Sequence, residues 1–141
     1  MQKVSRRTAV LLLLAAVAGC GGNGVQMGSV VGQVTLDGQP IKEAVISFTS
    51  DFTRSTRGKI INGEIVDLET FEPNDGVPVG KQRVTIRTAY AAAGNNDGTT
   101  PSYNTVPIVK IPPKYELLNT TPFEADIQRG KNELKFDLQS R

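Results

Sequence analysis

The stretch that decides the fold runs from residue 30 to residue 41 and reads VVGQVTLDGQPI. Val30, Val34 and Leu36 fall on one side of an alternation with period two, which predicts a β-strand over residues 29–36. We expect the strand to end in a turn at Asp37-Gly38-Gln39-Pro40. Glycine tolerates the positive φ that such turns need, and proline cannot donate a hydrogen bond to a continuing ladder.

Further strands are expected where the alternation returns or where short apolar runs lie between turn residues. These segments cover residues 44–49, 59–61, 64–68, 83–88, 106–111, 123–128 and 133–138. Asn62-Gly63 predicts a type I′ hairpin between 59–61 and 64–68, because that turn needs positive φ twice. Arg129-Gly130-Lys131-Asn132 predicts a second hairpin between the last two segments.

The expected fold class is all-β. Roughly seven short strands separated by regular turn signals are typical of an immunoglobulin-like β-sandwich. No segment after Cys20 keeps helical spacing for three turns. We therefore expect one seven-stranded sandwich over residues 29–141.

The deciding stretch also resembles the opening of carboxypeptidase regulatory-like and transthyretin-like (prealbumin-like) domains. In that family a G-x-V strand, a D-G-x-P turn and an A-x-V-x-F strand follow one another, and here Ala44, Ile46 and Phe48 complete the series. Residues 75–86 are similar to a later segment of the same family, and residues 111–138 look like small bacterial lipoproteins that carry the domain. The resemblance implies a transthyretin-like sandwich and implies no reaction.

The first 19 residues have the pattern of an export signal. Lys3, Arg6 and Arg7 precede an uncharged apolar run of ten residues from Ala9 to Ala18. Such a run is too short to span a bilayer core of about 30 Å as a helix and suits the apolar region of a signal peptide. Ser5-Arg6-Arg7 leaves open whether export uses the general or the twin-arginine route.

The run ends at Val17-Ala18-Gly19-Cys20, which resembles the lipobox of bacterial lipoproteins. The resemblance implies cleavage between Gly19 and Cys20, a signal peptide over 1–19, and a diacylglyceryl and an N-acyl lipid on Cys20. Residues 20–28 would then be a lipidated cysteine and a flexible tether to the membrane. The alternative is a stray cysteine behind an ordinary signal. In such lipoproteins an aspartate directly after the cysteine commonly causes retention in the inner membrane. Position 21 is a glycine here, which favours the outer membrane of the cell envelope.

Composition excludes several kinds of site. The chain has 141 residues, no His and one Cys, so a Ser-His-Asp triad, an imidazole metal ligand and an internal disulfide are all excluded. Three of the 16 basic residues lie in residues 1–19, which leaves 13 basic against 14 acidic side chains. Binding to nucleic acid needs a clustered basic face, and we expect none. We expect no cofactor beyond the lipid.

A loop over residues 91–105 is the candidate binding segment, since it has no apolar periodicity. Asn95, Asn96 and Asp97 could hold calcium, although ordinary solvation of a loop explains them as well. Three tyrosines could stack on sugar rings or could simply pack at strand edges. They are Tyr90, Tyr103 and Tyr115.

Acidic residues gather between positions 64 and 72, and two arginines lie on one strand. The acids could serve a carboxylate-dependent hydrolase or form a solvated rim, and the arginines could pair with acids across strands. These residues are Glu64, Asp67, Glu69, Glu72, Arg83 and Arg87. The leading interpretation is a non-catalytic, membrane-anchored envelope lipoprotein that binds a protein or polysaccharide through its loops. The alternatives are a structural spacer or accessory subunit of an envelope complex, and the hydrolase.

Overall fold

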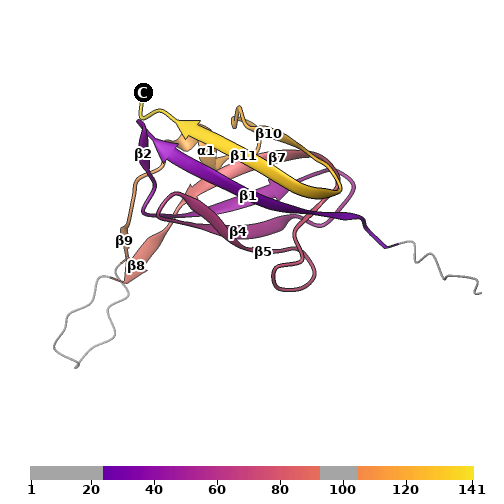
Figure 1. The fold of residues 1–141 in the computed structure, drawn as a ribbon. Coiled ribbons are helices and arrows are strands. Elements are labelled where there is room, and N and C mark those ends of the chain that lie inside the picture. The colour runs from indigo at the N-terminus through magenta and orange to yellow at the C-terminus, as the bar shows by residue number, and fades with distance from the viewer. Residues whose placement is uncertain (1–23, 93–104) are drawn as a thin grey trace, which may run out of the picture.

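The computed structural model describes residues 24–92 and 105–141, and more than half of these residues lie in β-strands (Figure 1). The elements are β1 (Met27–Leu36), β2 (Gln39–Pro40), β3 (Glu43–Thr49), β4 (Thr56–Ile61), β5 (Glu64–Glu69), β6 (Val77–Pro78), β7 (Gly80–Thr88), β8 (Tyr90–Ala92), β9 (Thr105–Pro107), α1 (Pro113–Glu116), β10 (Glu124–Ile127) and β11 (Gly130–Leu138). The expected all-β class is confirmed. Within the described residues no helix is long and apolar enough to cross a membrane.

Nine of the strands form one sheet with the main order β10-β7-β3-β4-β5-β1-β11, and β8 and β9 form a separate two-stranded sheet. Neighbours are antiparallel except for β1 and β11, which run parallel from the pair Gly28–Gly130 to the pair Leu36–Leu138. β1 and β5 are joined at a single pair, Gln33 and Glu64. The sheet curls at this weak junction, so that β1 and β11 lie as a layer across the other strands (Figure 1).

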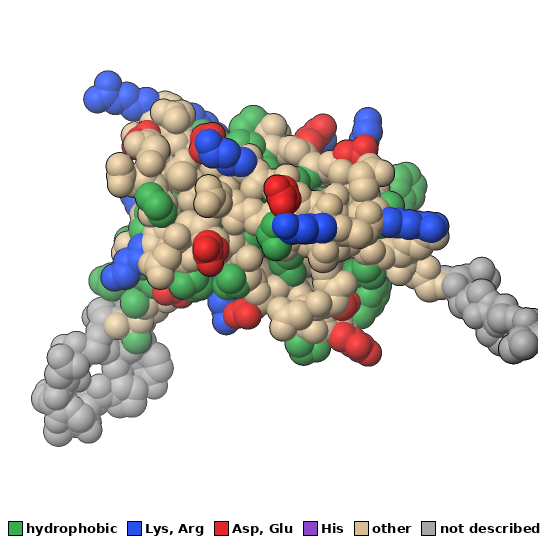
Figure 2. All heavy atoms as spheres, in the orientation of Figure 1, with side chains coloured by type: hydrophobic (Ala, Val, Ile, Leu, Met, Phe, Trp, Pro, Cys, Tyr) green, Lys and Arg blue, Asp and Glu red, His purple; other side chains and the backbone are tan. Residues whose placement is uncertain are grey.

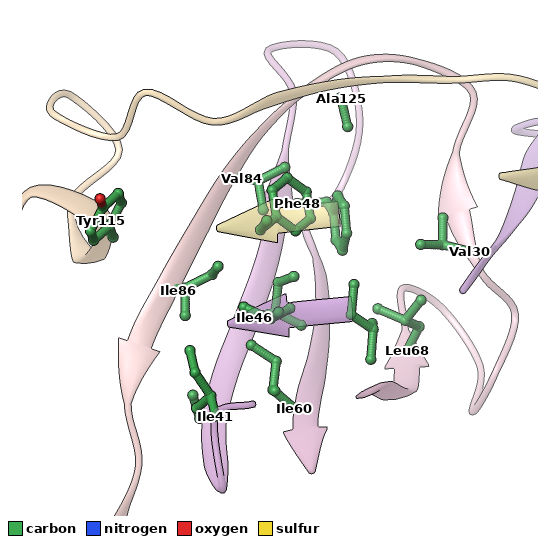
Figure 3. Close-up of a cluster of buried hydrophobic side chains, with 14 of the residues drawn as sticks. Val30, Ile41, Ile46, Phe48, Ile60, Leu68, Val84, Ile86, Tyr115 and Ala125 are labelled. Atoms are coloured by element: carbon green, nitrogen blue, oxygen red, sulfur yellow. The ribbon is translucent and has the colours of Figure 1, made fainter. Parts of the chain in front are cut away.

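The two arms of the curled sheet enclose one apolar core (Figure 3). Ile46 and Phe48 of β3 and Ile86 of β7 are completely buried and come from one arm. Val34 of β1 and Leu138 of β11 are equally buried and come from the other. The period-two pattern read from the deciding stretch therefore points one set of side chains inward along each strand.

Two turns have the geometry that their residues predict. Asp37 and Gly38 have φ of 50° and 80°, and they reverse the chain between β1 and β2. Asn62 and Gly63 have φ of 50° and 84° between β4 and β5. Positive φ at both positions is the type I′ signature, so the predicted hairpin at Asn62-Gly63 is confirmed.

The predicted hairpin at residues 129–132 is wrong. β10 pairs with β7, and β11 crosses to the other arm and pairs with β1. The reason lies in Asn132, whose side-chain Oδ1 accepts from the backbone N of Gln128 and whose Nδ2 donates to the Gln128 carbonyl. The amide of the side chain thus satisfies Gln128, and the backbone of Asn132 remains available to pair with Val30.

Several strand limits differ from the expectation. β1 begins at Met27, within the predicted tether, because Met27 and Gly28 already pair with β6. β4 begins at Thr56 and extends the expected strand by three residues. Residues 105–107 form β9, and Ile111 is a buried residue ahead of α1 and lies outside any strand. The predicted signal peptide and Cys20 lie outside the described residues.

The segment around α1 closes the open side of the curled sheet. The rings of Tyr115 and Phe123 stack with centroids 5.1 Å apart, and Phe123 meets Phe136 of β11 at 5.1 Å. Glu116 accepts hydrogen bonds from the backbone N and the hydroxyl of Thr88, at 2.8 and 2.7 Å. These contacts connect the end of β7 to the inner side of β11.

Candidate functional site

An open groove lies on the outer face of β3, β4 and β5 and has a volume of about 720 Å³. This size falls in the range of about 300–1,000 Å³ that is usual for ligand sites. Its lining combines charges of both signs with one apolar residue. The main contributors are Arg54, Arg57, Lys59, Asp67, Glu69 and Val45.

Strand alternation directs the basic side chains into this groove. Along β4, Thr56, Gly58 and Ile60 are buried, so Arg57 and Lys59 point outward. The neighbouring strand places Val45 directly beside Lys59. The two cations and the valine therefore share one face.

A β-bulge in β5 produces the hollow. Lys59 pairs with Val66 and Arg57 pairs with Glu69, so that two steps along β4 correspond to three along β5. The additional residue is Asp67, with φ of 52°, and its Oδ2 lies 3.1 Å from Nζ of Lys59. A bulge of this kind redirects a side chain and bends the strand.

Gly58 supplies the floor of the groove at the same point. A side chain there would meet Cδ2 of Leu68 at 2.6 Å and the carbonyl O of Val66 at 3.1 Å. The glycine thus lets the core residues Leu68 and Ile46 pack closely against β4 from the inside. The hollow on the outer face follows from the bulge at Asp67.

The charges in the groove are available to a ligand. The side chains of Lys59 and Asp67 are 59% and 58% exposed, and an ion pair in such a position contributes about 1 kcal/mol or less. Water already surrounds both groups, so a partner with complementary charges could replace this pairing at small cost. Figure 2 shows acidic and basic side chains interspersed on the visible face.

The acidic residues proposed for a hydrolase all lie at the surface. Glu64, Asp67, Glu69 and Glu72 are exposed in the structure. Glu64 lies opposite Gln33, while Asp67 pairs with Lys59. Glu69 lies opposite Arg57. A glycosidase needs two acids that flank a bound sugar, and these side chains instead lie along one strand and the loop that follows it.

The predicted binding loop is carried on a separate two-stranded hairpin. β8 and β9 pair from Tyr90–Pro107 to Ala92–Thr105, so the two ends of the expected loop are strand residues. Tyr90 is 61% exposed on β8. The other predicted residues of this loop, Asn95, Asn96, Asp97 and Tyr103, lie outside the described residues.

Tyr115 is a core residue and is not available for stacking on a ligand. Its side chain is 4% exposed, and its hydroxyl accepts a hydrogen bond from the backbone N of Gln139 at 3.0 Å. Neither alternative expected for this tyrosine describes it, because Tyr115 lies on α1 and packs in the core and not at a strand edge. Its hydroxyl also fixes the chain that follows β11.

The two outward arginines of β7 behave differently from simple ion pairs. Arg83 lies opposite Glu124 of β10, but its Nη1 donates to the carbonyl O of Leu118 at 3.0 Å. Arg87 lies opposite Val45, which places it on the same face as the groove. The cations on this face come from β4 and β7, which flank β3, and from the loop before β4.

The groove was not predicted from the sequence, because the expected strand covers only residues 59–61 and leaves Arg57 outside it. The signal was present in the alternation from Thr56 to Ile60, where outward cations separate small or apolar inward residues. The bulge at Asp67 has no comparable sequence signal. Among the described residues no group of three potential metal ligands comes together.

No protein-family model, no curated protein and no solved structure matches this chain.

Proposed function

We propose that this chain is a lipid-anchored, non-catalytic lipoprotein of a bacterial envelope, on the outer membrane. The observation that carries the proposal is the sequence Val17-Ala18-Gly19-Cys20, which directly follows an uncharged apolar run. The fold adds support, because an ordered domain begins at Met27, only seven residues after Cys20. Anchor, short tether and compact domain thus follow one another along the chain.

The domain is proposed to be a transthyretin-like, carboxypeptidase regulatory-like sandwich. The main path of the sheet supports this, because seven strands lie along it and curl around one core. The residues on which the resemblance rests also support it, since Asp37-Gly38 form a turn and Ile46 and Phe48 lie on a strand. This fold type supplies a rigid scaffold and no reaction of its own.

The proposed role of the domain is to bind another envelope protein through the outer groove. In the groove, Arg57 lies opposite Glu69, and Lys59 pairs with Asp67. Mixed charges of this kind at an exposed site give orientation and specificity to a protein contact. A polysaccharide site uses aromatic platforms, and none of the residues that line the groove is aromatic. The groove therefore favours a protein ligand over a glycan.

Metabolic labelling tests the anchor. In a bacterial expression host we expect Cys20→Ala to incorporate no labelled palmitate and to accumulate as a precursor that still carries residues 1–19. A Ser29→Ala variant, which keeps the cysteine, is the control and is expected to label normally. Normal labelling of Cys20→Ala would contradict the proposed anchor.

Crosslinking followed by mass spectrometry tests the groove. The double variant Arg57→Glu, Lys59→Glu is expected to lose a crosslinked protein partner that the unmodified chain captures in stoichiometric amount. Lys135→Glu is the matched control, because Lys135 is 67% exposed and pairs with Asp137 in the same way on another strand. Capture of glycan in place of protein indicates the polysaccharide alternative, and no partner at all indicates a spacer.

A further inference from the structure

Four segments meet at the end of the domain where the chain enters β1. Antiparallel pairing of β5 with β1 brings the end of β5 beside the start of β1. The start of β4 lies next to the end of β5, and the start of β7 lies next to the end of β10. The loops at residues 50–55, 70–76 and 128–129 therefore share one end with residue 24, and the hairpin β8–β9 lies at the opposite end (Figure 1). We call the end that contains residue 24 and the loops at 50–55, 70–76 and 128–129 the entry end.

The chain is fixed to the entry end at Gln26. The carbonyl O of Gln26 accepts from the backbone N of Val79 at 2.8 Å, and its Oε1 accepts from Nε of Arg129 at 2.7 Å. Gln26 follows Cys20 by six residues. Six residues span at most on the order of 20 Å when fully extended. A lipid on Cys20 therefore keeps the entry end close to the bilayer surface.

The entry end exposes two large aromatic side chains. Phe52 in the loop after β3 is 94% exposed, and Phe71 in the loop after β5 is 50% exposed. Val25, on the tether itself, is 45% exposed. A phenylalanine buries about 150–250 Å² when it is covered, so a partner that covers this end removes a substantial apolar area from water.

The two loops are held together at their bases. The buried hydroxyls of Thr56 and Thr70 share a hydrogen bond, and Thr70 also donates to the carbonyl O of Gly76 at 3.0 Å. Asp75 binds the backbone N of Phe71 at 2.8 Å. The backbone that carries Phe71 is thus fixed before any partner arrives, which lowers the entropy lost on insertion.

Formal charges at the entry end nearly cancel. Its loops carry two cations, Arg54 and Arg129, against three carboxylates, Asp51, Glu72 and Asp75, a formal balance of −1. Attraction to anionic headgroups consequently adds little, and the contact depends on the apolar side chains. Apolar and aromatic side chains of this kind insert at the boundary between headgroups and acyl chains.

We propose that the entry end is a membrane-contact surface, in which Phe52 and Phe71 insert into the bilayer that holds the lipid of Cys20. The inference rests on the proposed lipidation. It adds an orientation: the domain stands with the entry end against the membrane and presents the hairpin β8–β9 away from it. The groove on β3, β4 and β5 then lies along the side of the domain, where an envelope protein can reach it.

Single-tryptophan fluorescence tests this surface, because the chain contains no tryptophan of its own. Full-length protein carrying Phe52→Trp or Phe71→Trp is reconstituted into phosphatidylcholine vesicles, with and without brominated acyl chains. Val106→Trp is the matched control, since Val106 is 49% exposed on β9 at the opposite end. We expect a shift of emission to shorter wavelength and quenching by the brominated lipid at positions 52 and 71, and neither effect at position 106.

Four outcomes overturn the proposal in different ways. Protein that carries the lipid by mass spectrometry and floats with the vesicles, but whose Phe52→Trp and Phe71→Trp emission stays that of water-exposed tryptophan, overturns the contact and leaves the anchor intact. Protein without lipid on Cys20 overturns the anchor and the contact together. A shift that disappears on dilution to about one copy per vesicle assigns the surface to a second copy of the chain. An unchanged shift when anionic lipid is added supports the apolar contact, and a strong dependence on anionic lipid contradicts it.

Discussion

The backbone N of Thr70 donates to Oδ1 of Asp75 at 2.8 Å, and this bond closes the loop between β5 and β6. Oδ2 of the same carboxylate accepts from the backbone N of Phe71 and Glu72 at 2.8 and 3.1 Å. One side chain therefore satisfies three successive donors where β5 ends. Asn74 and Gly76, with φ of 59° and 91°, supply the reversal that brings Asp75 back to them.

Removing this carboxylate is expected to destabilise the domain. We predict that Asp75→Ala lowers the free energy of unfolding by about 2 kcal/mol, because three donors lose a charged acceptor. Urea denaturation followed by circular dichroism measures the change. Glu72→Gln is the control, since its exposed side chain makes no hydrogen bond within the described residues. Equal stability of Asp75→Ala and Glu72→Gln would show that water replaces the carboxylate without loss.

The lowered pKa of the Asp75 carboxyl should also make the stability of the domain depend on pH. Burial raises the pKa of its carboxyl, and the backbone N–H groups of Phe71, Thr70 and Glu72 together lower it by more, so the pKa lies below its ordinary value of 3.8. The folded state then binds the proton less readily than the unfolded state. The stabilisation is complete above pH 3.8 and is lost as the pH falls through the lowered pKa.

The measurement is a series of unfolding curves from neutral to acid pH. We expect the stability difference between the unmodified chain and Asp75→Asn to be constant above about pH 5 and to shrink in more acid solution. Asp37, Glu133 and Asp137 also have lowered pKa values and keep part of the acid sensitivity in the variant. A difference that grows towards acid pH contradicts the assignment.

Gly28 is expected to tolerate no larger residue. A Cβ there would lie 2.8 Å from Nδ2 of Asn132 and 2.8 Å from Cγ2 of Ile127, and it would collide with the carbonyl O of Gln128. We predict that Gly28→Ala destabilises the domain by about 1–3 kcal/mol, as overpacking does elsewhere. Gly24→Ala is the control, because nothing lies within 4 Å of a Cβ at that position. Thermal unfolding with equal midpoints for the two variants contradicts the prediction.

The cations of the groove should matter little for folding. We predict that Arg57→Ala and Lys59→Ala each change the free energy of unfolding by less than about 0.5 kcal/mol, because exposed charges contribute little. Thermal melts of both variants check this. A larger loss of stability at Lys59 would assign the pair with Asp67 to the fold and would weaken its proposed role in binding.

Local turn chemistry was readable from the sequence, and long-range pairing was not. The residue types of Asp37-Gly38 and Asn62-Gly63 are sufficient to predict turns, and the structure has a turn with positive φ at both places. The partner of β11 depends on which apolar face completes the core. Nothing in residues 129–132 distinguishes a hairpin from a crossing until the side chain of Asn132 is seen to bind Gln128.

The candidate site, too, could be predicted from the sequence only in part. Exposure of the acidic residues followed from alternation and turn placement. The groove required the register between β4 and β5, and that register shifts at Asp67, a non-glycine residue with positive φ. Such a conformation is stabilised by the surrounding strands and has no sequence signature of its own.

The parallel pairing of β1 with β11 bears on when the protein can fold. Thr35 and Asp137 are hydrogen-bonded across 102 positions of the chain, and the same ladder extends from Gly28 to Leu138. Until Leu138 has left the ribosome, one arm of the sheet has no second strand and the core is open to solvent. Non-local closure of this kind slows folding, and the core can close only after both the first and the last strand of the domain have been made.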